Sequence, residues 1–298
     1  MKFAKVIFFL IFSLVFILAL EVAAEPIRVF VSILPQKYFV ERIGGPWVIA
    51  EALVGKGQNP ATYNPNPKQM VRLSKSPVFF RIGVPFESIW INKIASSNKN
   101  LAIVDTHTDI PLLNMAKMYE SSHLENSTNI HLHREHGRKD PHIWTDPALV
   151  KVIAKNIELA LADLIPTRKN EFEQNYLQFE KDLNKLDLEI RETLKPVRKR
   201  QFLVFHPSWG YFAKAYGLNQ IAVEIEGKEP GSRTLGKIMK LGRELEVKVV
   251  FVQKQFSKTA AQKIAGALGA RVEAVDPVAE NYIENLLAVA KTFSKALN

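Results

Sequence analysis

The chain has 298 residues, 47% of them hydrophobic, and it contains no cysteine. Disulfides, thiolate metal ligands and a lipid-modified cysteine are therefore excluded. The formal net charge is +10, but the basic residues are scattered, apart from a run at 198–200. This distribution indicates general surface chemistry and argues against nucleic acid as a partner, because nucleic-acid-binding proteins gather their positive charge into a patch.

The first 24 residues have the pattern of a secretory signal peptide. Lys2 and Lys5 precede an apolar run at 6–20, and small residues up to Ala24 suit a cleavage site. The run is shorter than the roughly 20 residues that span a membrane, so an uncleaved anchor is only the alternative. We therefore expect Sec-dependent export to a bacterial periplasm, with a mature chain that begins at residue 25.

Short β-rich runs alternate with helical patterns through most of the mature chain. Strands are predicted at 27–34, 78–82, 101–104, 201–205, 247–252 and 271–275. Helical periodicity is clear at 149–164 and 259–268. Strands separated by helix-length segments favour βαβ units with mostly parallel sheets. We expect an α/β protein with an N-terminal lobe at 25–166 and a C-terminal lobe at 197–298.

The segment between the two lobes predicts one long helix. Its apolar residues recur at steps of four and three, namely Phe172, Tyr176, Phe179, Leu183, Leu186, Ile190 and Leu194. They form one stripe on a helix of roughly 27 residues, about 40 Å long. A coiled-coil dimerisation helix is the alternative, but the stripe contains aromatic residues and covers fewer than four heptads. We therefore predict a linking helix at 167–196 that packs as a rigid strut across both lobes of a monomer.

Five of the seven histidines lie within 20 residues of one another. They are His123, His131, His133, His136 and His142. Neutral imidazole is the commonest protein ligand for first-row transition metals, so the cluster indicates metal chemistry. Most of the cluster falls in a polar, charged loop at 117–139, for which a solvated surface insertion is the alternative reading.

Two more residues that can bind a metal lie immediately after predicted strands. His206-Pro207 follows the strand at 201–205, and Asp276-Pro277 follows the strand at 271–275. Ligands of open α/β sheets bind beyond the carboxyl ends of the strands, although a lone Asp there is often a helix cap. With His142 they predict a site of two imidazoles and one carboxylate, which suits zinc. His107 also follows a strand, but a surface role is favoured for it.

Three motifs carry a resemblance to a known family. The sequence DPHIWTDP at 140–147 resembles the Asp-Pro-His-x-Trp-x-Asp-Pro signature of the periplasmic zinc-binding proteins of cluster 9 ABC importers, the ZnuA and TroA type. FLVFHPSWGYFAKAYGL at 202–218 and FVQKQFSKTAAQKIAGALGARVEAVDPV at 251–278 resemble two further segments of that family. The His-rich insertion before DPHIW is typical of its zinc-specific members. The matching segments are spread over essentially the whole mature chain.

The resemblance implies two lobes bridged by one long helix, with a metal ion in the cleft between them. By position, His142, His206 and Asp276 inherit the metal-ligand roles. The family's fourth ligand is the His of an Asp-Pro-His-x-Tyr-Glu-Pro loop, which reads NPATYNP at 59–65 here. The imidazole is replaced by Ala61, and both acidic residues are replaced by Asn.

The implied function is a non-catalytic carrier that captures zinc and delivers it to an ABC permease and its ATPase in the inner membrane. Water or one of His131, His133 and His136 is expected to complete the metal shell. The alternatives are a diverged paralogue with altered or weaker binding, including manganese binding or an accessory role, and a metal-binding adhesin. A zinc hydrolase is a further class, but it needs a general base, for which only Glu280 offers itself.

Overall fold

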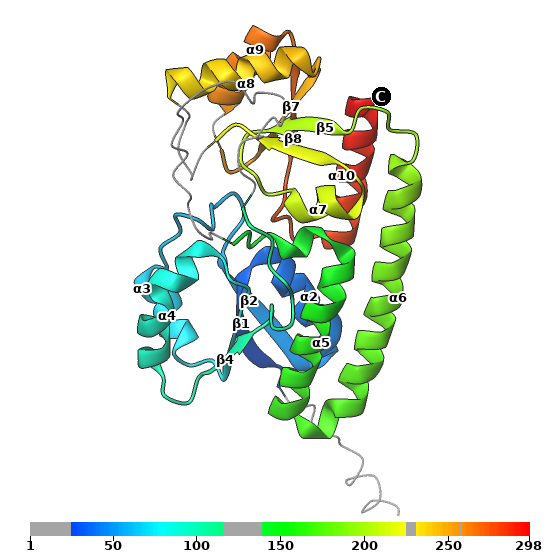
Figure 1. Cartoon of the computed structure of the whole chain (residues 1–298). Helices are drawn as coiled ribbons and strands as arrows, with labels where there is room; N and C mark the ends of the chain where they lie inside the picture. Colours follow the sequence, from blue (N-terminus) through cyan, green and yellow to red (C-terminus); the bar gives the residue numbers. More distant parts are fainter. Residues whose placement is uncertain (1–24, 116–138, 225–230, 257) are drawn as a thin grey trace, which may run out of the picture.

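Each half of the chain forms a four-stranded parallel sheet, and both sheets have the same strand order (Figure 1). The computed structural model describes residues 25–115, 139–224, 231–256 and 258–298. The order is β2-β1-β3-β4 in the N-terminal lobe and β6-β5-β7-β8 in the C-terminal lobe. All six strand pairings are parallel. The α/β fold with two lobes and a long helix is thus confirmed.

The N-terminal lobe contains the strands β1 (Ile27–Ile33), β2 (Val48–Val54), β3 (Val78–Arg81) and β4 (Ala102–Asp105), and the helices α2 (Leu34–Gly44), α3 (Pro67–Leu73) and α4 (Pro85–Ser97). The central strand β1 is fully buried from Val29 to Ile33. Its hydrophobic run therefore has no period of two, as expected for a parallel strand that is covered on both faces. The short 3-10 turn Gly45–Trp47 leads from α2 into β2.

The C-terminal lobe contains β5 (Gln201–Val204), β6 (Asn219–Ala222), β7 (Val249–Gln253) and β8 (Arg271–Val275), with α7 (Gly210–Ala215), α8 (Ser232–Glu244), α9 (Lys258–Leu268) and α10 (Tyr282–Leu297). In each sheet the strand order reverses between the first and third strands, β1 and β3 or β5 and β7. Ligand sites of open α/β sheets lie beyond the carboxyl ends of the strands at such a reversal. His206, two residues past β5, is therefore in a position typical of a ligand-binding residue.

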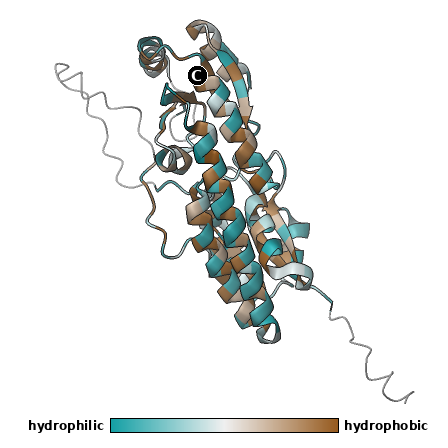
Figure 2. Cartoon of the chain, turned by 90° about the vertical axis from the view of Figure 1, so that its right-hand side faces the viewer, coloured by the Kyte–Doolittle hydropathy of each residue, from teal (hydrophilic) through white to brown (hydrophobic). Residues whose placement is uncertain are grey.

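The linking helix is α6 (Lys169–Leu194), which follows α5 (Pro147–Leu164) and the 3-10 turn Pro166–Arg168. It runs beside both lobes (Figure 1), and it packs against α2, α5 and α10. Six members of its predicted stripe are buried, and Tyr176 is partly exposed. In Figure 2 the outward side of the long helices is largely hydrophilic, which agrees with an apolar stripe turned inward.

One large hydrophobic core passes through both lobes. Phe251 of β7 stacks on Phe293 of α10 with ring centroids 4.2 Å apart, and Tyr282 at the start of α10 packs edge-on against Phe39 of α2 at 4.8 Å. The contact between Tyr282 and Phe39 joins the C-terminal helix to the N-terminal lobe. A second, smaller cluster lies on the other face of the C-terminal sheet, under α8 and α9.

The predicted strands match observed strands to within two residues at each end, and the strand at 271–275 matches at both ends. Two observed strands, β2 and β6, are not among the predicted ones. No helix in the described ranges is long and apolar enough to cross a membrane. Residues 1–24, which carry the predicted signal peptide, lie outside these ranges.

Candidate metal centre

His142 is held in place by Asp140, two residues before it. The Asp140 Oδ1 accepts the backbone N–H of His142 at 2.9 Å and lies 2.7 Å from the His142 Nδ1. Asp140 is itself fixed, because its N–H donates to the Leu113 carbonyl and its own carbonyl accepts from the Tyr211 hydroxyl. A carboxylate bound to one ring nitrogen fixes the orientation and the tautomer of an imidazole, leaving the other nitrogen for a metal.

His206 is held by the strand ends of the C-terminal sheet. The fully buried Gln253, the last residue of β7, accepts the His206 N–H through its Oε1 at 3.2 Å and donates to the His206 carbonyl. Phe256 stacks on the imidazole with ring centroids 4.7 Å apart. The Nδ1 of His206 lies 2.5 Å from Oε1 of Glu224. The ring therefore has one orientation, set by three neighbours.

The two imidazoles lie next to each other across the boundary between the lobes. Their ring centroids are 5.3 Å apart, and the ring planes are inclined at 76°. Because each Nδ1 faces a carboxylate, we assign the proton to Nδ1 on both rings, which leaves both Nε2 lone pairs free. Burial lowers the pKa of His206, and the adjacent His142 lowers it further, although Glu224 acts in the opposite direction. The neutral, metal-binding form of His206 is thereby favoured.

Asp276 follows β8 as expected, but its carboxylate has local partners. Oδ1 accepts from Gln255 Nε2 at 3.0 Å and from the Val278 N–H at 3.1 Å, and Oδ2 lies 3.8 Å from Lys254 Nζ. The segment is tied to the His142 segment, since Trp144 Nε1 donates to the carbonyl of the residue after Asp276 at 2.6 Å. The loops that carry His142 and Asp276 are thus hydrogen-bonded to each other.

The described residues contain no group of three or more His, Asp or Glu side chains arranged to hold a metal ion. Within these residues the structure brings the imidazoles of His142 and His206 together, while the Asp276 carboxylate contacts Gln255, Val278 and Lys254. Ala61 lies in an ordered loop, where its N–H donates to the Asn59 side chain and the Pro60 carbonyl accepts from Phe86. The histidines His131, His133 and His136 lie outside the described residues.

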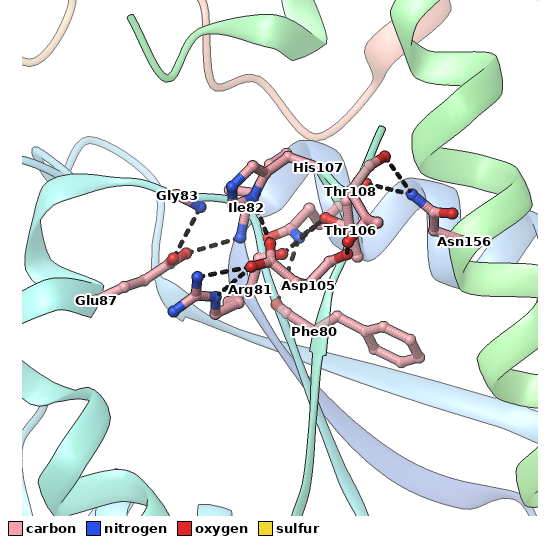
Figure 3. A network of polar contacts seen from close by, with 11 residues as sticks. Phe80, Arg81, Ile82, Gly83, Glu87, Asp105, Thr106, His107, Thr108 and Asn156 are labelled. Atoms are coloured by element: carbon pink, nitrogen blue, oxygen red, sulfur yellow. Dashed lines mark hydrogen bonds and ion pairs between the residues drawn. The ribbon is translucent and has the colours of Figure 1, made fainter. Parts of the chain in front are cut away.

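His107 belongs to a separate polar network at the carboxyl ends of β3 and β4, which Figure 3 shows. Its Nδ1 contacts Asp105, whose Oδ2 also accepts two N–H groups of Arg81 at 3.1 and 2.6 Å. Burial alone would raise the pKa of Asp105, but the bonds from His107 and Arg81 outweigh it and lower this pKa. His107 is partly buried, so its expected surface role is only partly right, and it is not grouped with His142 and His206.

Three residues that shape the site were missed by the sequence analysis. The motif at 140–147 contains Asp140, and its place two residues before His142 is a local signal for a carboxylate–imidazole pair. Glu224 lies two residues past β6 and Gln253 ends β7, so their contacts with His206 depend on the strand order β6-β5-β7. No local pattern marks them, because they lie 18 and 47 residues from His206.

Comparison with known proteins identifies the family. The family model described as "ZnuA: Zinc-uptake complex component A periplasmic" matches residues 29–296, most of the 298-residue chain. The chain belongs to the ZnuA family. A crystal structure of ZnuA aligns with a TM-score of 0.82 and 37% identity, covering 92% of this chain and 100% of that one. A ZnuA deletion mutant solved with zinc bound gives a TM-score of 0.83 and 36% identity over 92% of this chain and 98% of that one.

Curated relatives lead to the same family. The "High-affinity zinc uptake system protein ZnuA" of Yersinia pestis is 26% identical over 264 residues, which are 85% of this chain and 83% of that protein. The "Zinc-binding protein AdcA" of Streptococcus pyogenes is 23% identical over 269 residues, 87% of this chain. The chain spans about half the length of AdcA, 52%.

Proposed function

We propose that the chain is a periplasmic solute-binding protein that captures zinc and delivers it to an ABC-type permease with its ATPase. The observation that carries this proposal is the pairing of His142 and His206 from different lobes, each with its Nδ1 on a carboxylate. Zinc favours imidazole nitrogen, and a site between lobes lets a partner distinguish loaded from empty protein. The names of the ZnuA relatives support zinc as the cargo.

Asp276 is proposed as the third ligand. Its carboxylate is largely buried, with 12% of the side chain exposed, and its loop is bonded to the His142 loop through Trp144. Oδ1 accepts from Gln255 and from the Val278 N–H, so Oδ2, which lies 3.8 Å from Lys254 Nζ, is the oxygen proposed to bind zinc. Ala61 offers no donor, so water or one of His131, His133 and His136 is proposed as the fourth ligand.

A non-catalytic role is proposed, because a zinc hydrolase needs a free base beside the metal-bound water. Glu280, the only carboxylate suggested for that task, forms an ion pair with Lys37 of α2. The same ion pair links the segment before α10 to the N-terminal lobe. Cleavage of residues 1–24 by a signal peptidase and a monomeric state are part of the proposal. Manganese is the alternative cargo, and a manganese-bound periplasmic protein of the same fold is known at 15% identity.

The test is a zinc titration of residues 25–298 followed by thermal unfolding, together with the metal content of the purified chain. Ligand binding at a hundredfold excess over Kd adds about 2.7 kcal/mol of stability. For a chain of this size that gain raises Tm by roughly 5–10 °C. We expect one zinc per chain, and we expect His206→Ala to abolish the rise in Tm.

The matched control is His107→Ala, which removes an imidazole from the separate network around Asp105. This variant should keep the full zinc-dependent rise even if its metal-free Tm is lower. A mature chain that retains neither zinc nor manganese, or a His206→Ala variant that still responds fully to zinc, would refute the proposed carrier. Parallel titration with manganese decides between the two metals.

A further inference from the structure

Glu224 is a buried carboxylate whose one described side-chain partner is His206. Its side chain is 3% exposed, and Oε1 lies 2.5 Å from the His206 Nδ1. Strand pairing puts it there, because β6 lies beside β5 and the Glu224 N–H donates to the Phe205 carbonyl, one residue before His206. The backbone thus places the Glu224 carboxylate at the Nδ1 side of the His206 ring, opposite the Nε2 that would bind a metal.

A buried carboxylate that faces a neutral imidazole does little to stabilise the folded protein. Removing a carboxylate from water is costly, and a single hydrogen bond to a neutral ring offsets only part of that cost. A neutral amide of the same shape would accept the same N–H at a lower desolvation cost. A carboxylate at position 224 is therefore better explained by a role in the metal-bound protein than by a role in the metal-free protein.

The loop at 59–65 contains no acidic residue, and this absence suggests the role of Glu224. Positions 59 and 64 of this loop are asparagines. The Asn59 oxygen accepts from the Ala61 N–H within the loop, and the Asn64 oxygen accepts from Trp90 Nε1 of α4. A dication needs compensating negative charge nearby, and this loop supplies none. Glu224 and its counterpart Asp140 instead place one carboxylate behind each imidazole.

We propose that Glu224 is a positioning residue that sets the tautomer of His206 and strengthens its Nε2 as a zinc donor. The inference rests on the proposed function. Glu224 accepts the Nδ1–H, which keeps the proton off Nε2 and leaves that nitrogen free to bind a metal. Its negative charge polarises the imidazole and offsets the charge of the cation. Partners of this kind typically alter metal affinity by about 10–100-fold when they are removed.

The experiment measures zinc affinity by competition with a chromogenic chelator for the mature wild type, Glu224→Ala and Glu224→Gln. We expect Glu224→Ala to weaken zinc binding about 10–100-fold. Glu224→Gln keeps an oxygen acceptor without the charge, so we expect a smaller loss and an equal or higher metal-free Tm. Glu246→Gln, which removes an exposed carboxylate paired with Lys199 in the same lobe, is the control and should leave affinity unchanged.

A second readout is the tautomer of His206 in the metal-free protein, seen in long-range ¹H–¹⁵N spectra of histidine-labelled chain. Wild type and Glu224→Gln should show the proton on Nδ1, and Glu224→Ala should lose this preference. A purely structural role predicts the reverse pattern, in which both variants lower the metal-free Tm and leave zinc affinity unchanged. That result would overturn the inference while leaving the carrier intact. Absence of zinc binding by the wild type would instead refute the carrier itself.

Discussion

At the scale of single residues, the site depends on close packing around Asp140 as much as on the imidazoles. A Cβ added to Gly210, the first residue of α7, would lie 2.7 Å from the Asp140 Oδ2. That separation is shorter than real Cβ contacts, so any side chain at 210 has to displace the carboxylate that holds His142. Gly210 has an ordinary backbone conformation, so its requirement for glycine comes from space alone.

We therefore predict that Gly210→Ala weakens zinc binding, because Asp140 moves and His142 loses its fixed orientation. The overpacking should cost about 1–3 kcal/mol of stability in the metal-free protein. Zinc affinity should fall by about 10–100-fold, as for other losses of a carboxylate partner. Urea denaturation and the chelator competition measure the two effects separately.

The control for this variant is Gly236→Ala, also in a helix, where a Cβ would meet no atom within 4 Å. Replacing an exposed helical glycine with alanine should stabilise the chain by about 0.5–1 kcal/mol and leave zinc affinity unchanged. If Gly210→Ala bound zinc as tightly as Gly236→Ala, the proposed coupling from Gly210 through Asp140 to His142 would be wrong.

At the scale of elements, α6 holds the lobes together through one side of the helix. Phe179 packs against Phe39 and Tyr38 of α2 with ring centroids 5.8 and 5.9 Å apart, and the Arg42 guanidinium lies over its ring. Arg42 also pairs with Asp182 one turn further along α6. The helix is therefore joined to α2 by aromatic packing and by charge at neighbouring positions.

Phe179→Ala is expected to destabilise the chain by about 3–5 kcal/mol, since it opens a cavity in a fully buried aromatic cluster. Leu188→Ala removes an apolar side chain from the same helix at a position that is 64% exposed, and it should change stability by no more than about 0.5 kcal/mol. Chemical denaturation of both variants provides the comparison. Similar losses for the two would show that the stripe read from the sequence does not carry the packing of α6.

The sequence was a good guide to α6 because its stripe repeats over seven positions, and long patterns average out local exceptions. It was a poor guide to β6 (NQIA), which has only four residues and begins with two polar ones. In β2 (VIAEALV) a charged Glu51 interrupts the apolar run. Both segments form strands because they pair with a neighbouring strand, β6 with β5 and β2 with β1. Such long-range pairing is difficult to recognise from a short stretch of sequence.

In the candidate site too, some residues could be predicted from local sequence and others could not. Motif and strand-end reasoning predicted His142 and His206 as ligands, because each is marked by an adjacent proline and a nearby element boundary. The structure places the two imidazoles side by side, and their roles as metal ligands stay predictions. Glu224 could not be found like this, since its meeting with His206 follows from the order of strands in the folded sheet. The assignment of Asp276 as a ligand remains a prediction, because its carboxylate binds Gln255 in this structure.

At the scale of the whole molecule, the two hydrophobic cores differ in what they connect. The larger one runs from the N-terminal lobe through α6 and α10 into one face of the C-terminal sheet. The smaller one covers the other face of that sheet, where α8 buries only Ile238 and Gly242. In Figure 1, α8 and α9 lie at the end of the molecule, away from α6. Local stability follows buried apolar contact, so it should not be uniform.

We predict that amides of α8 and α9 exchange with solvent through openings of lower free energy than amides of α6 and α10. Native-state hydrogen exchange over a series of low denaturant concentrations measures this difference directly. Openings confined to α8 and α9 should leave the backbone of His206 in place, because Gln253 at the end of β7 holds it beside the end of β5. Equal free energies in α8 and α6 would mean that the molecule opens only as one unit. The layer of α8 and α9 could then not move independently of the residues proposed to bind zinc.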